Sequence, residues 1–138
     1  MSAFNQITLI GIGLIGSSLA RVIKREKLAK LVVAGDSSAA HGATAKKLKI
    51  VDSATTNLKS AVKDADLVIL CVPVGACGMV AKIIGPHLKA GAIVTDVGSV
   101  KGAVISAVTP YIPKGVHFIP GHPIAGTEHS GPTAGFAE

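Results

Sequence analysis

The sequence predicts an α/β fold, in which helices cover both faces of one parallel sheet in three layers. Short aliphatic runs alternate with longer segments of helical periodicity along all 138 residues. Hydrophobic residues make up 49% of the chain but aromatic residues only 3%, so we expect a core of Val, Ile, Leu and Ala. Such aliphatic strands suit a parallel sheet that is buried on both sides. The length predicts one domain, residues 1–138, with a substantial core.

Six aliphatic runs have the length and composition of strands. These runs are residues 7–10, 31–35, 50–54, 67–72, 92–96 and 116–119. The segments between them predict helices. We expect these helices at residues 17–27, 39–48, 58–63, 76–88 and 99–111. Strands and helices that alternate through short loops form right-handed crossovers, so the sequence predicts a doubly wound sheet.

A glycine-rich motif follows the first predicted strand and opens the first predicted helix. It reads Gly-Ile-Gly-Leu-Ile-Gly at residues 11–16, which is the GxGxxG spacing of dinucleotide-binding loops. In such loops Gly11 permits a tight turn, Gly13 lets the backbone approach a pyrophosphate, and Gly16 lets the helix pack on the strand. The motif therefore favours a Rossmann-type domain. A domain of this type that binds nothing, or a methyltransferase that holds adenosylmethionine, remains an alternative.

The residues around this motif indicate which dinucleotide is bound. The N–H groups of Leu14 and Ile15, at the start of the helix, are expected to face the phosphates. Asp36 ends the second predicted strand about 20 residues after the last glycine, where its carboxylate would bind the adenosine ribose and repel a 2′-phosphate. Ser37 is neutral, where an arginine would accommodate that phosphate. NAD is therefore favoured over NADP, although Asp36 could instead be a strand-end cap.

Two polar residues follow the last two predicted strands. His122 lies in a turn between Gly121 and Pro123, and Ser99 follows the fifth strand. Because ligands bind at the carboxyl ends of parallel strands, an imidazole there can exchange a proton with a substrate. Ser99 could instead be a helix N-cap, and His122 could bind only backbone. The other histidines are expected to have surface or structural roles. They are His41, His87, His117 and His129.

The charge and the cysteines limit the other classes of partner. The formal net charge is +6, and we interpret the clusters of basic residues as solvated helix faces, with steering of anionic ligands as the alternative. No aromatic residues interleave them, so we expect no nucleic-acid partner. Cys71 and Cys77 lack metal or CxxC spacing and are expected to be reduced core thiols of a cytoplasmic protein. No metal site, signal peptide or membrane span is predicted.

Three segments together resemble the prephenate dehydrogenase family, which includes the arogenate and cyclohexadienyl dehydrogenases of tyrosine biosynthesis. They are GIGLIGSSLA at 11–20, DVGSVK at 96–101 and PGHPIAGTEHSG at 120–131. The first is shared with many dehydrogenases, whereas the third is highly specific. The resemblance covers only the family's N-terminal nucleotide-binding domain. Members continue into a helical domain that forms a homodimer and supplies an arginine for the substrate carboxylate.

The same resemblance implies a reaction and the residues that carry it. The family oxidatively decarboxylates prephenate or arogenate, with hydride passing to nicotinamide. It implies that His122 accepts the proton of the substrate hydroxyl, that Ser99 orients His122 and contacts the same hydroxyl, and that Thr127 and Glu128 line the substrate pocket. Further cofactor contacts are expected at Val72, Pro73, Val74 and Gly98.

Three further expectations concern alternatives and length. A hydroxyacid dehydrogenase of the 3-hydroxyisobutyrate type and a non-catalytic NAD-sensing module are the other two functional hypotheses. Residues 132–138 read as the start of another helix, so we expect this chain to be part of a longer protein. We also expect the 138-residue piece alone to show little turnover.

Overall fold

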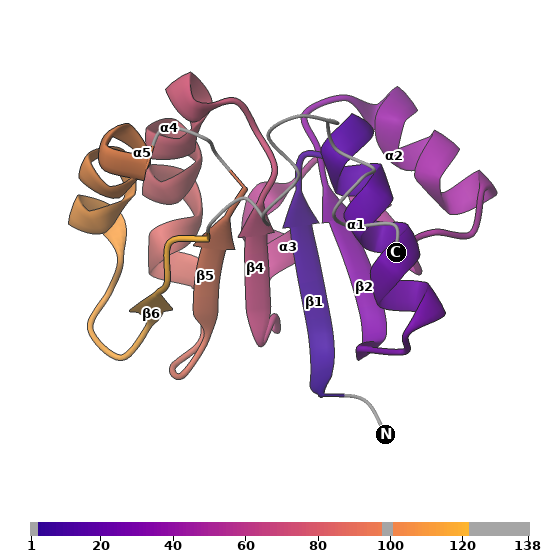
Figure 1. The fold of residues 1–138 in the computed structure, drawn as a ribbon, viewed down its shortest axis with the longest axis horizontal. Helices are drawn as coiled ribbons and strands as arrows, with labels where there is room; N and C mark the ends of the chain where they lie inside the picture. Colours follow the sequence, from indigo (N-terminus) through magenta and orange to yellow (C-terminus); the bar gives the residue numbers. More distant parts are fainter. Residues whose placement is uncertain (1–2, 98–100, 122–138) are drawn as a thin grey trace.

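A computed structural model describes residues 3–97 and 101–121, which form one parallel sheet with helices on both faces (Figure 1). The sheet has six strands in the order β3-β2-β1-β4-β5-β6, and every neighbouring pair is parallel. The strands are β1 Phe4–Ile10, β2 Ala29–Gly35, β3 Ser53–Thr55, β4 Leu67–Leu70, β5 Ile93–Asp96 and β6 His117–Phe118. This is the strand order of the Rossmann fold, so the predicted fold class is confirmed.

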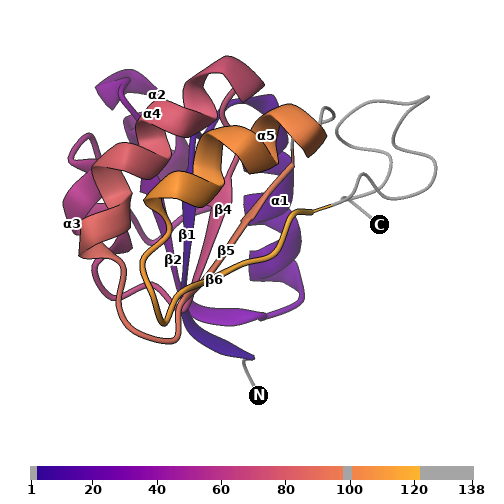
Figure 2. The same cartoon turned by 90° about the vertical axis from the view of Figure 1, so that its left-hand side faces the viewer.

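The helices divide between the two faces of the sheet. They are α1 Leu14–Arg25, α2 Ala39–Lys47, α3 Leu58–Val62, α4 Val74–Ile84 and α5 Lys101–Val108, with 3-10 turns η1 Gly85–His87 and η2 Thr109–Tyr111. Figure 2 shows the sheet close to edge-on, with α1 on one side and α3, α4 and α5 on the other. The sheet is therefore wound in both directions from β1 and β4, as the alternation of segments predicts.

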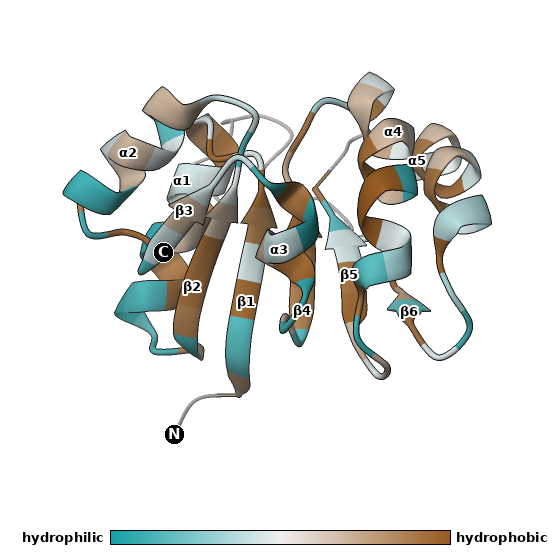
Figure 3. Cartoon of the chain, turned by 180° about the vertical axis from the view of Figure 1, so that it is seen from behind, coloured by the Kyte–Doolittle hydropathy of each residue, from teal (hydrophilic) through white to brown (hydrophobic). Residues whose placement is uncertain are grey.

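Each face of the sheet has its own apolar core. Alternate strand residues face opposite sides, so Leu9 packs with α1 and α2, whereas Ile10 packs with α3, α4 and α5. Both side chains are at most 1% exposed. Figure 3 shows the strands mainly in the hydrophobic colour and the outer turns of several helices in the hydrophilic one. The alternation of aliphatic side chains along each strand therefore decides which helices pack against each face of the sheet.

Several element boundaries differ from the predictions, four of them for an identifiable reason. Helix α1 begins at Leu14 rather than residue 17, because the glycine-rich motif itself forms its first turn. The run at 50–54 is a strand only from Ser53, since Ile50 and Val51 are buried in a loop that packs under α1 and α2. Helices α4 and α5 end early, in 3-10 turns that contain Pro86 and Pro110.

A carboxylate fastens the strands together at the amino end of the sheet. The backbone N–H groups of Asn5 and Gln6 donate to Asp66 Oδ2 at 2.7 and 3.1 Å, and Lys89 forms an ion pair with the same side chain. The hydrogen bond from Lys89 and those from the backbone lower the pKa of Asp66, while burial opposes them. These contacts tie β1 and Lys89 to the residue that precedes β4.

None of the helices in the two described ranges is long and apolar enough to cross a lipid bilayer.

Candidate functional site

The candidate site lies where the carboxyl ends of β1 and β4 meet. Chain leaving β1 enters α1 on one face of the sheet, and chain leaving β4 enters α4 on the other, so a crevice opens between the two connections. A pocket of about 330 Å³ occupies this position. The residues that line it are Ile10, Gly11, Gly13, Gly35, Asp36, Ser37, His41, Leu58, Cys71, Val72, Pro73, Ala76 and Val80. Six of the residues predicted to bind the cofactor therefore come together here.

The glycine-rich loop fits tightly between β1, α1 and the end of β4. Gly11 has φ +93°, a conformation that favours glycine, and a Cβ there would lie 3.0 Å from Val72 Cγ1. A Cβ on Gly16 would collide with the carbonyl oxygen of Gly11. A Cβ on Gly13 would meet no atom within 4 Å in the described ranges, so none of the described residues fills the space at this position. The loop is closed on its protein side and open at Gly13.

The start of α1 has the features of an anion-binding helix terminus. Gly13 is its N-cap residue, and no side chain of the described residues caps it. The first N–H groups of a helix have no acceptor within the helix, and they carry a partial positive charge. Leu14 is 69% exposed, so solvent and ligands reach this end. The predicted role of Leu14 and Ile15 as phosphate donors is compatible with this geometry and remains a prediction.

Asp36 connects the glycine-rich loop to the turn after β2. Its side chain accepts a 2.8 Å hydrogen bond at Oδ2 from the backbone N–H of Ile12 and a 2.7 Å bond at Oδ1 from Ser38. The residue is only 9% exposed. Both roles considered for Asp36 are thus compatible: it caps this turn, and a carboxylate retains further acceptor positions for a ribose hydroxyl.

His41 enters the site although no role in it was expected from the sequence. Its Nδ1 lies 3.4 Å from Asp36 Oδ2, and its ring lines the crevice while 59% of the side chain stays exposed. Ser38 is the N-cap of α2, and its Oγ accepts a hydrogen bond from the His41 backbone N–H. The sequence spacing could have indicated this contact. Helix α2 begins at Ala39, shortly after Asp36, so the first turn of the helix lies beside the end of β2.

The end of β4 forms the other wall of the crevice. Val72 and Pro73 line the pocket, whereas Val74, the first residue of α4, is not among the described lining residues, and the expected cofactor contacts of all three remain predictions. Cys71 also lines the pocket, and burial, with a smaller contribution from nearby Cys77, raises its pKa to about 12. This thiol therefore stays protonated near neutral pH and contributes an uncharged wall.

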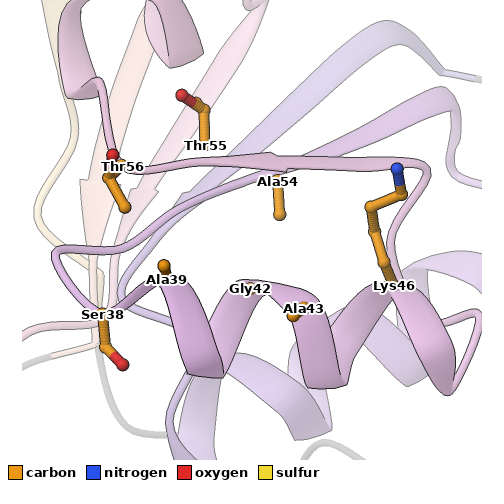
Figure 4. Close-up of a pocket in the computed structure, with 8 residues that line it drawn as sticks. All are labelled: Ser38, Ala39, Gly42, Ala43, Lys46, Ala54, Thr55 and Thr56. Carbon is orange, nitrogen blue, oxygen red and sulfur yellow. The ribbon is translucent and has the colours of Figure 1, made fainter.

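A second hollow, of about 440 Å³, lies between α2 and the edge strand β3 (Figure 4). Ala54 points from the strand toward the helix, and Ala39 and Ala43 face it from α2. Lys46 is the one charged residue among the described residues that line this hollow. The glycine-rich loop does not contribute to it, so the crevice at β1 and β4 is the better candidate for a nucleotide.

The residues predicted to act on the substrate lie outside the described residues. They are Ser99, His122, Thr127 and Glu128, and Gly98, which is expected to contact the cofactor, also lies outside the described residues. The described chain on either side converges at the carboxyl edge of the sheet: Gly121 N–H donates to Asp96 Oδ1 at 3.1 Å, and Asp96 ends β5. Asp96 is 2% exposed. Within the described ranges no group of three or more potential metal ligands occurs.

The crevice fits a dinucleotide in its chemistry. An uncapped helix start faces open space at Gly13, and a carboxylate stands at the end of β2. These are the features that hold a pyrophosphate and a ribose in Rossmann domains.

Comparisons with known proteins place the chain in one family. The family model described as "Prephenate dehydrogenase, nucleotide-binding domain" matches residues 19–138. A cyclohexadienyl dehydrogenase of Zymomonas mobilis is 45% identical over 138 residues, which are 100% of this chain and 47% of that protein. A prephenate dehydrogenase of Bacillus subtilis is 34% identical over 129 residues, covering 93% of this chain and 35% of that protein.

A solved structure agrees with these sequence matches. The prephenate dehydrogenase of Aquifex aeolicus, in complex with hydroxyphenyl propionate and NAD+, superposes with a TM-score of 0.78 at 31% identity. The match covers 92% of this chain and 43% of that chain, so our chain spans about half or less of the length of these relatives. The chain belongs to the prephenate dehydrogenase family, in which it corresponds to the nucleotide-binding domain.

Proposed function

We propose that the protein containing this chain is an NAD-dependent dehydrogenase that oxidatively decarboxylates prephenate, arogenate or both. The observation that carries this proposal is the crevice, where an uncapped helix start, an open glycine position and Asp36 lie together. The activities of the family's named members, and the NAD+ in the Aquifex aeolicus complex, support the same conclusion.

The described residues suggest how the chain would hold NAD. Asp36 and Ser37 would face the adenosine ribose, and the backbone around Gly13 would face the pyrophosphate. Val72 and Pro73 would pack beside the cofactor from the end of β4. When bound, NAD supplies the acceptor for the hydride that leaves the substrate ring.

The chain's own contribution to the chemistry is the removal of a proton. We propose that His122 accepts the proton of the substrate hydroxyl, which would otherwise leave a high-energy oxocarbenium as hydride departs. Ser99 would orient His122, and Thr127 and Glu128 would line the substrate pocket. The hydrogen bond from Gly121 to Asp96 supports this, because it brings the residue preceding His122 to the end of β5.

The oligomeric state of the whole protein and its location in the cell complete the proposal. The whole protein would form a homodimer through a helical domain that also supplies an arginine for the substrate carboxylate, in line with the length of the relatives. It would act in the cytoplasm, because Cys71 and Cys77 are free thiols, as a reducing compartment favours.

An assay of substrate range tests the proposal. The full-length protein is expected to reduce NAD with prephenate or arogenate and not with 3-hydroxyisobutyrate, since the chain belongs to another family than the hydroxyacid alternative. NAD binding without turnover of any of these compounds would favour the non-catalytic sensing module and would overturn the proposal.

A further inference from the structure

We propose that Asp96 is a positioning residue, whose carboxylate holds the chain that leads into His122 against the carboxyl end of β5. This inference rests on the proposed role of His122 as the proton acceptor, and it adds a residue on which that role depends. Asp96 was not expected from the sequence to act in the site.

The chain after β6 follows β5 through hydrogen bonds at every second residue. The backbone N–H of Ile119 donates to the Val94 carbonyl oxygen at 2.9 Å, and the pair of residues two positions earlier is joined in the same way. Regular parallel pairing would continue from Gly121 to the backbone carbonyl of Asp96. Instead, the Gly121 N–H donates to the side-chain Oδ1 of Asp96 at 3.1 Å. The carboxylate therefore replaces a backbone acceptor where the chain leaves the sheet.

The backbone at Gly121 lies directly against the end of β5. A Cβ at this position would collide with the backbone oxygen of Asp96 and would lie 3.1 Å from Thr95 Oγ1. Only glycine allows so close an approach of one backbone to another. The packing of this glycine and the hydrogen bond to the carboxylate thus hold the same peptide unit in place.

Asp96 is itself fixed by the sheet. It is the last residue of β5, it pairs in register with Leu70 of β4, and it is 2% exposed. Burial of a polar group costs stability unless hydrogen bonds compensate for it, so a carboxylate at this place indicates a specific role. The other buried carboxylate among the described residues, Asp36, also accepts a backbone N–H from a loop of the candidate site.

The position of this hydrogen bond connects it to the proposed chemistry. Gly121 directly precedes His122 in the sequence. A general base must lie within hydrogen-bond reach of the proton that it removes, and a misplacement of about 1 Å can slow a reaction about 10²-fold. Asp96 is not among the described residues that line the crevice, so its loss should affect turnover and not NAD binding.

Kinetics and calorimetry of the full-length protein test this inference. Asp96→Ala removes the acceptor, Asp96→Asn keeps an oxygen in its place, and Gly121→Ala forces the chain away from β5. Asp66→Ala is the matched control, because it removes a carboxylate that accepts two backbone N–H groups at the opposite end of the sheet. Melting temperatures are measured for all four variants.

The inference predicts a specific pattern across these variants. In Asp96→Ala and Gly121→Ala, kcat should fall roughly 10- to 100-fold, while the dissociation constant of NAD stays within about twofold. Asp96→Asn should recover most of this loss. Asp66→Ala should lower the melting temperature and leave kcat unchanged at a temperature where it is folded. An Asp96→Asn variant as slow as Asp96→Ala would overturn the assignment of the carboxylate oxygen.

A double-mutant cycle with His122→Asn separates positioning from general damage to the fold. If Asp96 acts through His122, adding Asp96→Ala to His122→Asn should lower kcat by no more than about twofold further. Losses that multiply, or an Asp96→Ala variant with unchanged kcat, would overturn the inference. If Asp96→Ala does not fold, the same cycle with Gly121→Ala decides by the same criteria. An unchanged kcat in His122→Asn alone would instead overturn the proposed role of His122.

Discussion

Because none of the described residues fills the space at Gly13, a substitution there should weaken cofactor binding more than it weakens folding. A Cβ at Gly13 would meet no atom of the described residues within 4 Å, and its φ of −74° lies outside the left-handed region that favours glycine. Gly13→Ala should therefore cost at most about 1 kcal/mol as a poorer N-cap, or about 4 °C in melting temperature. The added methyl would stand where the pyrophosphate approaches the backbone.

The loss in binding should be larger than the loss in stability. Moving a pyrophosphate away from one charge-assisted hydrogen bond costs about 1.5–3 kcal/mol, so NAD affinity should fall roughly 10- to 100-fold. Calorimetry gives the dissociation constant, and thermal unfolding gives the stability. Gly102→Ala is the matched control, since a Cβ at this exposed position of α5 also meets none of the described residues, and it should leave NAD affinity unchanged.

Substitution of a third glycine, Gly16, should mainly reduce the stability of the fold. A Cβ on Gly16 would collide with the Gly11 carbonyl oxygen, so Gly16→Ala should destabilise the fold by about 1–3 kcal/mol. If Gly13→Ala binds NAD within twofold of the unmodified protein, the pyrophosphate does not lie at the start of α1 and the assignment of this loop is wrong.

Three further predictions concern the carboxylates of Asp36 and Asp66 and the thiol of Cys71. Asp36→Ala should narrow the preference for NAD over NADP in calorimetry and should lower stability by about 1–3 kcal/mol, because the N–H groups of Ile12 and Ser38 lose their acceptor. The lowered pKa of Asp66 stabilises the fold above the ordinary carboxyl pKa, and this stabilisation is lost as the pH falls through the lower folded value. Urea unfolding of Asp66→Asn should accordingly depend less on pH below about 5 than that of the unmodified protein, and equal slopes would contradict this. Cys71, with a pKa of about 12, should resist alkylation by iodoacetamide at about pH 8 in the native state, as measured by mass spectrometry; rapid labelling would contradict the burial that raises its pKa.

The fold could be predicted from the sequence because its signals are local and repeated. The aliphatic run at β4 and the glycine-rich motif after β1 each specify a backbone conformation without help from distant residues. Boundaries were less predictable where a local signal was ambiguous. Ile50 and Val51 are as buried as strand residues, yet they lie in a loop. An apolar run indicates burial, and burial alone does not distinguish a strand from a buried loop.

The parts of the candidate site that lie within one segment of the chain could be predicted from the sequence. The contacts between two segments could not. The positions of Gly11, Gly13 and Asp36 follow from the spacing of a single β-α-β unit. The role of Asp36 as a link to Ile12, and the approach of His41 to it, depend on how the turn after β2 meets the loop after β1. Such contacts arise from tertiary packing, and composition or periodicity does not encode them separately.

The kinetics of His122→Asn in the full-length protein test the central claim most directly. If His122 takes the substrate proton, the variant should lose roughly 10²–10⁴-fold in kcat and should lose the acidic limb of the pH–rate profile. Its dissociation constant for NAD should remain nearly unchanged, since the described residues that line the crevice come from the segments around Gly11, Asp36 and Val72. A kcat within a few-fold of the unmodified enzyme, or NAD affinity that falls as much as turnover, would show that His122 is structural and would contradict the proposed mechanism.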